Sequence, residues 1–285
     1  MLKKNRFEGQ VAVITGASSG IGKASAIEFA REGARTVLVS RSRDKLERVA
    51  HEVRGIGGEA VVIPTDVSDA WQAKEMVAVA LKEFSRLDIL FNNAGSSSVG
   101  RIDEFDFVPN TKKMMDVDYF GTVNVTIEVL PVMKRQGYGH IMNMSSVVGK
   151  KAFHHFGGYS SAMHAITGFS DALRQELHGT GINVSTIHPA LTQTPLLKNV
   201  KPEDMPPPFK SFTPISVESV ARAVVEGIAH NRARIVVPFQ PRMVLLADAV
   251  SPGIGDIIVR MLPNRTFSRL IGIYKGKSYH ESVSE

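Results

Sequence analysis

The 285-residue sequence contains no cysteine, so disulfide bonds and thiolate metal sites are excluded. Internal repeats and low-complexity tracts are also missing. With 43% hydrophobic and 22% charged residues, the chain is neither disordered nor fibrous, and it can bury the core of one large α/β domain or of two smaller ones. The lack of cysteine fits an intracellular protein.

Long apolar runs are lacking as well. The N-terminal segment MLKKNRFEGQ has the positive charge of a signal peptide, but the apolar run that follows, VAVITG, is too short and ends in glycine. Residues 240–277 are apolar and basic, yet prolines and glycines interrupt them too often for a transmembrane helix. We therefore expect a cytoplasmic protein, with peripheral membrane association left open.

The charge balance is positive, with a formal net charge of +6 at pH 7 and a pI near 9.5. Such basicity suits nucleic acid, an anionic membrane or an anionic ligand, and it does not choose among them. The sequence contains no nucleic-acid recognition motif, and no carboxylates accompany its histidines at metal-binding spacing. We expect neither a nucleic-acid partner nor a metal site.

Short β-branched runs alternate with longer segments whose apolar residues recur every three or four positions, which is typical of strands and helices around a parallel sheet. We predict a Rossmann-type doubly wound α/β fold, with helices on both faces of about seven strands. The expected strands are 11–16, 35–40, 60–65, 87–92, 140–145, 183–188 and 233–238. The expected helices are 20–31, 43–54, 69–85, 110–136, 158–178 and 217–230.

Two further segments complete the organisation of the chain. Residues 195–215 contain PPPF, and their apolar residues follow neither the helical nor the strand spacing. We therefore expect a long loop or lid there. Residues 1–238 form the predicted sheet domain, and 239–285 form a C-terminal helical extension. Amphipathic pieces of this extension could cap a substrate cleft or join a subunit interface. Alternatively, they could lie on an anionic membrane, with Arg260, Arg265, Arg269 and Lys275 toward the headgroups.

The stretch TGASSGIG, residues 15–22, follows the first strand directly and opens the first helix. Glycine here lets the backbone turn tightly and approach a pyrophosphate, whose charge then lies against free amide groups at a helix N-terminus. The position predicts a dinucleotide site rather than an ordinary turn. The residues expected to bind the cofactor here are Gly16, Ser18, Ser19, Gly20, Ile21 and Gly22.

The end of the second expected strand lacks an acidic residue. An NAD enzyme usually places a carboxylate there for the ribose 2′-hydroxyl, whereas this chain has SRSR at residues 40–43. A guanidinium binds phosphate through paired donors, so Arg41, helped by Ser40 and Arg43, is the candidate for a 2′-phosphate. The sequence favours NADP (NADPH) over NAD, the alternative being an ordinary solvated arginine pair.

Further motifs follow in order: Thr65-Asp66-Val67, Asn92-Asn93-Ala94-Gly95, Ser146 with Tyr159, and His188-Pro189. Together with TGASSGIG, they resemble the short-chain dehydrogenase/reductase family over about residues 8–238. The resemblance implies a homodimer or homotetramer. It also implies a set of cofactor contacts, in which Asp66 and Val67 flank the adenine, Asn93, Ala94 and Gly95 support the cofactor, and Pro189, Leu191 and Thr194 lie beside the nicotinamide.

The same resemblance assigns the chemistry. Members of the family hold the substrate oxygen between a serine and a tyrosine while the nicotinamide gives or takes a hydride. Ser146 and Tyr159 stand at the matching positions. Tyrosine would be the acid or base, and serine the hydrogen-bonding partner that orients the substrate. The alternative is a purely structural hydroxyl at a strand end and an aromatic residue at a helix start.

Two active-site positions depart from the family pattern. The family's lysine, one helical turn after the tyrosine, is Met163, and its asparagine is Asp118. A thioether cannot lower the tyrosine pKa or hold the ribose, and a carboxylate would tend to raise that pKa further. Oxidation needs tyrosinate as base, whereas reduction needs neutral tyrosine as acid, so we expect reduction to suffer less.

Nearby residues leave some questions open. His154 and His155 precede the expected catalytic helix and could donate a proton to a substrate, whereas His164 points away from Tyr159. The apolar residues of 195–215 favour a lipid-like, steroid-like or aromatic substrate. We therefore expect an NADP-dependent oxidoreductase acting on an apolar carbonyl or alcohol with reduced efficiency. The alternative is a cofactor-binding pseudoenzyme that acts through binding or assembly.

Overall fold

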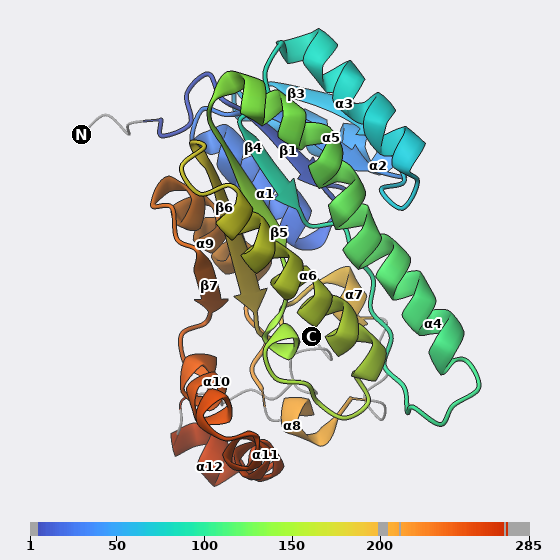
Figure 1. The fold of residues 1–285 in the computed structure, drawn as a ribbon, viewed down its shortest axis with the longest axis vertical. Coiled ribbons are helices and arrows are strands. Elements are labelled where there is room, and N and C mark those ends of the chain that lie inside the picture. Colours follow the sequence, from blue (N-terminus) through green and yellow to red (C-terminus); the bar gives the residue numbers. More distant parts are fainter. Residues whose placement is uncertain (1–4, 199–204, 211, 271, 273–285) are drawn as a thin grey trace.

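The computed structural model describes residues 5–198, 205–210, 212–270 and 272. Its centre is a seven-stranded parallel sheet in the order β3-β2-β1-β4-β5-β6-β7 (Figure 1). The strands are β1 (Val11–Thr15), β2 (Arg35–Ser40), β3 (Ala60–Pro64), β4 (Ile89–Asn92), β5 (Gly139–Met144), β6 (Ile182–Pro189) and β7 (Arg234–Val237). This topology confirms the predicted doubly wound fold.

Helices cover both faces of the sheet, and each face has its own apolar core. One face carries α1 (Gly20–Arg31), α2 (Arg43–Gly55) and α9 (Val217–Ala229). The other carries α3 (Ala70–Phe84), α5 (Gly121–Gln136) and α6 (Gly157–Glu176). Strand β1 shows why both cores form: Ala12 and Ile14 face the first, whereas Val11 and Val13 face the second.

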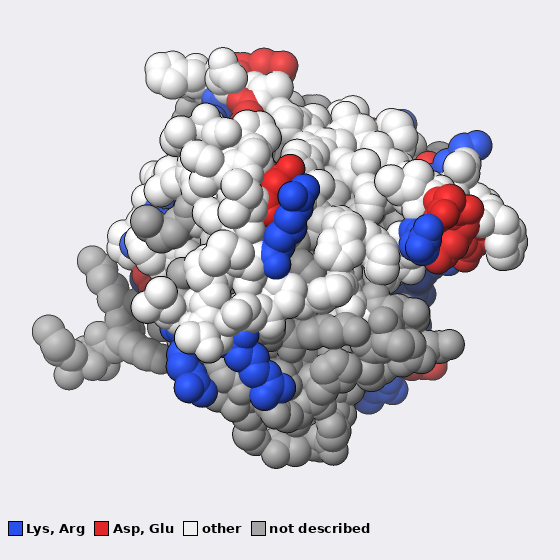
Figure 2. All heavy atoms as spheres, turned by 90° about the horizontal axis from the view of Figure 1, so that it is seen from below, with Lys and Arg blue, Asp and Glu red and all other residues white. Residues whose placement is uncertain are grey.

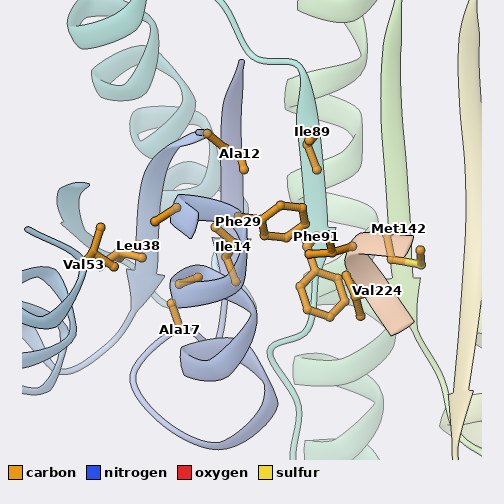
Figure 3. Packing of buried hydrophobic residues seen from close by; sticks show 14 of the residues in the cluster. Ala12, Ile14, Ala17, Phe29, Leu38, Val53, Ile89, Phe91, Met142 and Val224 are labelled. Carbon is orange, nitrogen blue, oxygen red and sulfur yellow. The ribbon is translucent and has the colours of Figure 1, made fainter. Parts of the chain in front are cut away.

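The first core is centred on large apolar side chains of the middle strands and of α1. Phe29 of α1, Ile14 of β1 and Phe91 of β4 are fully buried and point into the same region (Figure 3). Burial of one such side chain contributes about 1.5–3 kcal/mol. The packing fixes the ends of β1 and β4, from which the loops of the functional site begin.

The helix predicted over 110–136 is longer and less regular than expected. It consists of α4 (Phe107–Met114), a π-helical segment η1 (Met115–Phe120) and α5. A π-helical turn adds a residue to the usual α-helical turn, and hydrophobic spacing does not reveal it. The Thr122 hydroxyl of α5 donates to the Asp118 carbonyl oxygen of η1 at 2.7 Å. The irregular turn carries Asp118, which the sequence singles out as unusual.

The segment 195–215 is not simply the long loop expected from its prolines. It contains two short helices, α7 (Pro195–Lys198) and α8 (Pro207–Lys210), while residues 199–204 and 211 lie outside the described residues. Both helices begin with proline. The first helical position tolerates proline because its missing N–H would have no partner within the helix.

The C-terminal extension is helical, as predicted. Helices α10 (Pro241–Val250), α11 (Pro252–Met261) and α12 (Arg265–Leu270) lie beyond β7 at the lower end of the molecule in Figure 1. The Lys151 ammonium forms ion pairs with Asp248 of α10, at 2.7 Å, and Asp256 of α11, at 2.6 Å. These contacts hold the extension against the segment that follows β5. Lys275 and the rest of the tail beyond 272 lie outside the described residues.

Candidate functional site

A cleft of about 500 Å³ opens at the carboxyl ends of the strands. The strand order reverses between β1 and β4, and ligands of open α/β sheets bind outside such a switch point. The loops after β1, β2 and β3 line one end of the cleft, and those after β5 and β6 line the other. The sheet thus brings together motifs that lie far apart in the sequence.

The glycine loop after β1 forms a close-fitting wall of this cleft. Gly16 and Gly20 have φ values of 67° and 56°, which lie in the left-handed region that favours glycine. A Cβ at Gly22 would lie 2.3 Å from the carbonyl oxygen of Gly16, so only glycine lets α1 pack this closely. The loop therefore leads directly into the N-terminus of α1, where free amide groups can hold an anion.

The loop after β4 is fastened to the glycine loop by hydrogen bonds. The Thr15 hydroxyl oxygen accepts from the amides of Asn93 at 2.9 Å and Ala94 at 3.0 Å. The Asn93 side-chain amide donates to the Thr15 carbonyl oxygen at 3.0 Å. These bonds hold the two sides of the switch point in a fixed arrangement.

The structure places most of the predicted cofactor residues around the cleft and leaves two outside its lining. Gly22 serves the packing of α1, and Arg43 forms an ion pair with Glu47 at 3.7 Å. The predicted cofactor residues that do line the cleft are Gly16, Ser18, Ser19, Gly20, Ile21, Ser40, Arg41, Asp66, Val67, Asn93, Ala94, Gly95, Tyr159, Pro189, Leu191 and Thr194.

The end of β2 supplies two cations rather than the expected arginine pair. Arg41 and Lys45 both line the cleft and are exposed, and neither forms an ion pair with a carboxylate of the described part of the chain. The Ser40 hydroxyl is buried and has no hydrogen-bond partner among the same residues. Lys45 was not predicted from the sequence, although its position in the first turn of α2, four residues after Arg41, was a usable signal.

Ser146 and Tyr159 approach each other from two different elements. Ser146 caps the 3₁₀ helix η2 (Val147–Gly149) after β5: its oxygen accepts from the Val148 amide at 3.3 Å, and its hydroxyl donates to the Pro189 carbonyl at 3.3 Å. Tyr159 is the third residue of α6 and lines the cleft. Ser146 and Tyr159 thus line the same end of the cleft.

The pKa of the Tyr159 phenol lies well above its ordinary value. Removal from water is the main cause, negative charge at Asp118 adds to it, and the nearby Ser146 hydroxyl opposes it. Tyr159 is therefore a neutral phenol at neutral pH. It can donate a proton, but it is a poor base.

Met163 follows Tyr159 by one helical turn and belongs to an apolar cluster with Phe156 and Ile166. Its side chain is 4% exposed and lines the cleft. Among the described residues that line the cleft, Arg41 and Lys45 are the only cationic side chains, and both belong to the end formed by the loop after β2. The Tyr159 end thus has no lysine to stabilise a phenolate.

Asp118 lies on the same side of the cleft, with 1% of its surface exposed. Its Oδ1 accepts from the Ser96 amide at 2.7 Å and from the Ser96 hydroxyl at 3.3 Å. Its Oδ2 is buried and has no hydrogen-bond partner in the described structure. Burial raises the pKa of Asp118 to about 8, although both bonds from Ser96 oppose the shift.

The histidines do not fill the place of the missing lysine. His154 and His155 pack against each other and do not line the cleft, and the His164 ring turns back to the Ser160 carbonyl oxygen, with Nδ1 at 2.8 Å. The described residues also contain no group of three or more His, Asp or Glu side chains that could hold a metal ion.

Comparisons with known proteins agree with this geometry. The family model for short chain dehydrogenase matches residues 10–205. An uncharacterized oxidoreductase of Mycobacterium tuberculosis is 34% identical over 265 residues, which cover 92% of this chain and 74% of the relative. An 11-beta-hydroxysteroid dehydrogenase-like protein of Arabidopsis thaliana is 31% identical over 266 residues, which cover 90% of this chain and 84% of that protein.

Solved structures of related proteins have the same fold. A short chain dehydrogenase/reductase from Burkholderia phymatum, in complex with NAD, matches with a TM-score of 0.77 and 25% identity, over 87% of this chain and 95% of that one. Levodione reductase matches with a TM-score of 0.74 and 27% identity, over 81% and 96% of the two chains. This chain therefore belongs to the short-chain dehydrogenase/reductase family of oxidoreductases.

Proposed function

We propose that this chain transfers a hydride between NADP(H) and a carbonyl or secondary alcohol of an apolar substrate, and that it favours reduction. One observation carries the proposal: a single cleft is lined by two unpaired cations, Arg41 and Lys45, and by the hydroxyl groups of Ser146 and Tyr159. The cations suit a phosphorylated nucleotide, and the pair suits acid catalysis at a carbonyl oxygen.

The residues of the cleft fit a dinucleotide. The glycine loop lets a pyrophosphate approach the amides of α1, and a larger residue at Gly22 would push helix and loop apart. Asp66 and Val67 follow β3 on the adenine side, whereas Leu191 and Thr194 follow β6 on the nicotinamide side. The buried Ser40 hydroxyl without a partner supports a polar ligand at the end of β2.

The proposed preference for NADP rests on charge at the end of β2. The Burkholderia relative was solved with NAD, so the family resemblance alone does not select the coenzyme. In this chain no acidic residue follows β2 directly, and Arg41 and Lys45 line the cleft there. Two cations would bind a 2′-phosphate through charge-assisted hydrogen bonds, and neither is occupied by a carboxylate of the described residues.

The proposed reduction uses the two polar groups at the other end of the cleft. The bound nicotinamide supplies the hydride that the carbonyl carbon accepts. The Ser146 hydroxyl holds the carbonyl oxygen, and Tyr159 donates its phenolic proton to that oxygen, which gives the alcohol. Because Tyr159 is neutral at neutral pH, it already carries the proton that reduction requires. Oxidation would need the phenolate, which this site disfavours.

We infer reduced efficiency from Met163 and Asp118. After the proton transfer, Tyr159 is left as a phenolate beside a thioether and a buried carboxyl group, with no cation among the described residues of that end. A phenolate without a nearby positive charge is costly in a site of low polarity. The transition state for proton transfer is therefore less stabilised than it would be beside a lysine.

The substrate end of the cleft is apolar, which supports a lipid-like, steroid-like or aromatic substrate. Val148, Phe156 and Phe209 line it, and the ring centroids of Phe156 and Phe209 lie 5.2 Å apart. Leu191 and Leu197 line it as well. Apolar walls with a few polar groups are typical of sites that bind apolar small molecules.

A pseudoenzyme is the second candidate function. Met163 and Asp118 support it, because both changes fall at the reacting end while the dinucleotide end keeps its glycines and cations. Such a protein would bind NADPH and act through binding or assembly. It would consume no NADPH with any carbonyl.

We further propose that the protein forms a homo-oligomer and that its lower face contacts a second surface. No helix of the described residues is long and apolar enough to cross a membrane. Seen from below, the molecule presents a broad area with few charged side chains (Figure 2). Exposed apolar side chains of α10 and α11, Leu246, Val250, Ile254 and Ile257, suit either a subunit interface or peripheral membrane contact.

One paired experiment tests the proposal. Binding of NADPH and NADH is measured by fluorescence, and NADPH consumption is then followed across a panel of apolar carbonyl compounds, with Tyr159→Phe as the control. We expect tighter binding of NADPH, slow turnover, and loss of turnover in Tyr159→Phe. Binding without turnover, with turnover restored in Met163→Lys/Asp118→Asn, identifies the pseudoenzyme. Failure to bind NADPH, or full activity of Tyr159→Phe, would contradict the proposal.

A further inference from the structure

Asp118 occupies an environment that is better matched to a neutral acid than to a carboxylate. Its two oxygens differ: Oδ1 accepts both bonds from Ser96, and Oδ2 is buried without a partner in the described structure. A carboxylate can accept at both oxygens, whereas a protonated acid has one acceptor oxygen and one O–H donor. A proton on Oδ2 removes the negative charge from a buried oxygen that no donor of the described structure stabilises.

The elements packed against η1 bring no positive charge to this carboxyl group. Residues 93–100, which follow β4 directly, contain no charged residue, and Arg101, Asp103 and Glu104 farther along the loop are exposed to solvent, with Asp106 just before α4. The start of α6 contributes the neutral phenol of Tyr159, whereas Asp171, Arg174 and Glu176 lie toward the other end of α6. His164 of α6 is exposed and turned back onto its own helix. The charged residues of α4 and of η1 itself, Lys112, Lys113 and Asp116, are exposed to solvent, and Glu128, Lys134 and Arg135 lie farther along α5. No described charge pairs with Asp118.

We propose that Asp118 is held as a neutral carboxylic acid at neutral pH, a positioning residue that keeps the surroundings of Tyr159 uncharged and slows reduction when it ionises. The first half, the protonation state of Asp118, concerns this chain alone. The second, kinetic half, the slower reduction when Asp118 ionises, rests on the proposed function. An unpaired charge at this depth would be expensive, and protonation removes it. The direction of the pKa shift, upward to about 8, agrees with this assignment.

The link to Tyr159 is electrostatic. Negative charge at Asp118 raises the pKa of the Tyr159 phenol, so ionised Asp118 makes the phenol a weaker acid. Neutral Asp118 leaves the phenol a better proton donor, and the phenolate formed after transfer then meets no negative neighbour. The absence of a cation at this end makes the protonation state of Asp118 the main local control over charge beside Tyr159.

The first test needs neither cofactor nor activity. The infrared carbonyl stretch of a protonated carboxylic acid is separate from the carboxylate bands, and a pH titration in deuterated buffer follows it in the parent, in Asp118→Asn and in the matched control Asp116→Asn. We expect a carbonyl band at pH 7 that disappears as the pH rises past about 8, that is missing in Asp118→Asn and that persists in Asp116→Asn. A band absent from the parent at pH 7, or unchanged by Asp118→Asn, would overturn the assignment.

The second test separates the kinetic half from the proposed function. Reduction by the parent should fall roughly fivefold between pH 8 and pH 9 if the ionised form is inactive, because the protonated fraction falls by that factor. Asp118→Asn should hold its rate across the same interval, and Asp116→Asn should follow the parent. Equal pH profiles for the parent and Asp118→Asn would overturn the kinetic half. A parent that binds NADPH but reduces nothing refutes the proposed function and the kinetic half together, while the infrared titration still decides the protonation state.

Discussion

The two ends of the cleft differ in the charged and polar groups that line them. The end formed by the loops after β1 and β2 has glycine turns, helix amides and two unpaired cations, Arg41 and Lys45. The reacting end has a phenol, a thioether and a buried acid, and no described side chain there is cationic. One end is arranged for an anionic ligand, whereas the other disfavours negative charge.

Under the proposed function, binding and chemistry therefore rest on separate sets of residues. The glycine loop depends on backbone geometry and on close packing against Asn93 and Ala94, which belong to neither α6 nor η1. The chemistry depends on the charge beside one phenol, which a single side chain can change. A chain can therefore keep its nucleotide site while its reaction slows or becomes one-directional.

The largest expected effect is at Tyr159. Tyr159→Phe removes the proton donor and should lower NADPH-dependent reduction by about 10²–10⁴-fold, the range of general acid catalysis. The affinity for NADPH, measured by fluorescence, should change by no more than a few-fold. A comparable loss of affinity and rate would show that the two ends are not separable.

The pH dependence of stability should distinguish Asp118→Asn from the parent. The folded pKa of Asp118 is raised above its unfolded value, so its favourable contribution is complete at low pH and is lost as the pH rises toward about 8. The stability of Asp118→Asn relative to the parent should therefore increase by about 1.4 kcal/mol per pH unit between about pH 5 and pH 7. Denaturant titrations of the two proteins at several pH values measure the difference in their free energies of unfolding. A difference that does not change with pH would contradict the proposal that Asp118 is protonated.

Met163→Lys should make the reacting end resemble a lysine-containing site. The ammonium would pair with Asp118 and stabilise the phenolate, so alcohol oxidation should rise by roughly 10- to 100-fold, and reduction by less. Initial rates in both directions with one alcohol–carbonyl pair measure the asymmetry. Met163→Leu serves as the uncharged control and should leave both rates near those of the parent, whereas an equal gain from Met163→Leu would indicate packing rather than charge.

Gly22→Ala tests how tightly the dinucleotide end is packed. The added Cβ would lie 2.3 Å from the Gly16 carbonyl oxygen and 2.5 Å from the Asn93 amide nitrogen, so helix or loop must shift. Overpacking of this kind costs about 1–3 kcal/mol in the free energy of unfolding. Gly55→Ala is the matched control on α2, because a Cβ there meets nothing within 4 Å. Equal stability of the two variants in chemical denaturation would show that the loop is looser than described.

The smallest expected effect is at Arg41. Arg41→Ala should weaken NADPH binding by about tenfold, since one charge-assisted contact contributes about 1.5 kcal/mol, and it should leave NADH binding nearly unchanged. Arg43→Ala is the control, because Arg43 pairs with Glu47 and does not line the cleft. An equal loss for both coenzymes, or for both variants, would remove the basis for NADP selection.

Most of the fold could be predicted from the sequence, but less of the electrostatics of the site. The strand predicted at 11–16 is Val11–Thr15, and the helix predicted at 20–31 is Gly20–Arg31, because apolar spacing reflects the same burial that forms the sheet. The π-helical turn at Asp118 was not predictable, since an added residue within a continuous helix leaves no pattern in hydrophobicity. The two short helices of 195–210 were missed because proline was taken to exclude helix.

Side-chain environments were the part that the sequence could not provide. Arg41 and Arg43 look equivalent in SRSR, and only the structure separates the arginine that lines the cleft from the one paired with Glu47. Lys45 could have been found from its position in the first turn of α2, four residues after Arg41. Asp118 was predicted to add negative charge, and its burial, which the sequence does not reveal, raises its pKa to about 8 and supports the proposed neutral acid.

The most direct test of the account is a crystal structure of the chain with NADPH. We predict density for the coenzyme across the carboxyl ends of β1 and β4, with the 2′-phosphate at Arg41 and Lys45 and the nicotinamide beside the Tyr159 hydroxyl. Coenzyme bound elsewhere, or a Tyr159 side chain turned away from the nicotinamide, would contradict the claim that one cleft serves both binding and chemistry.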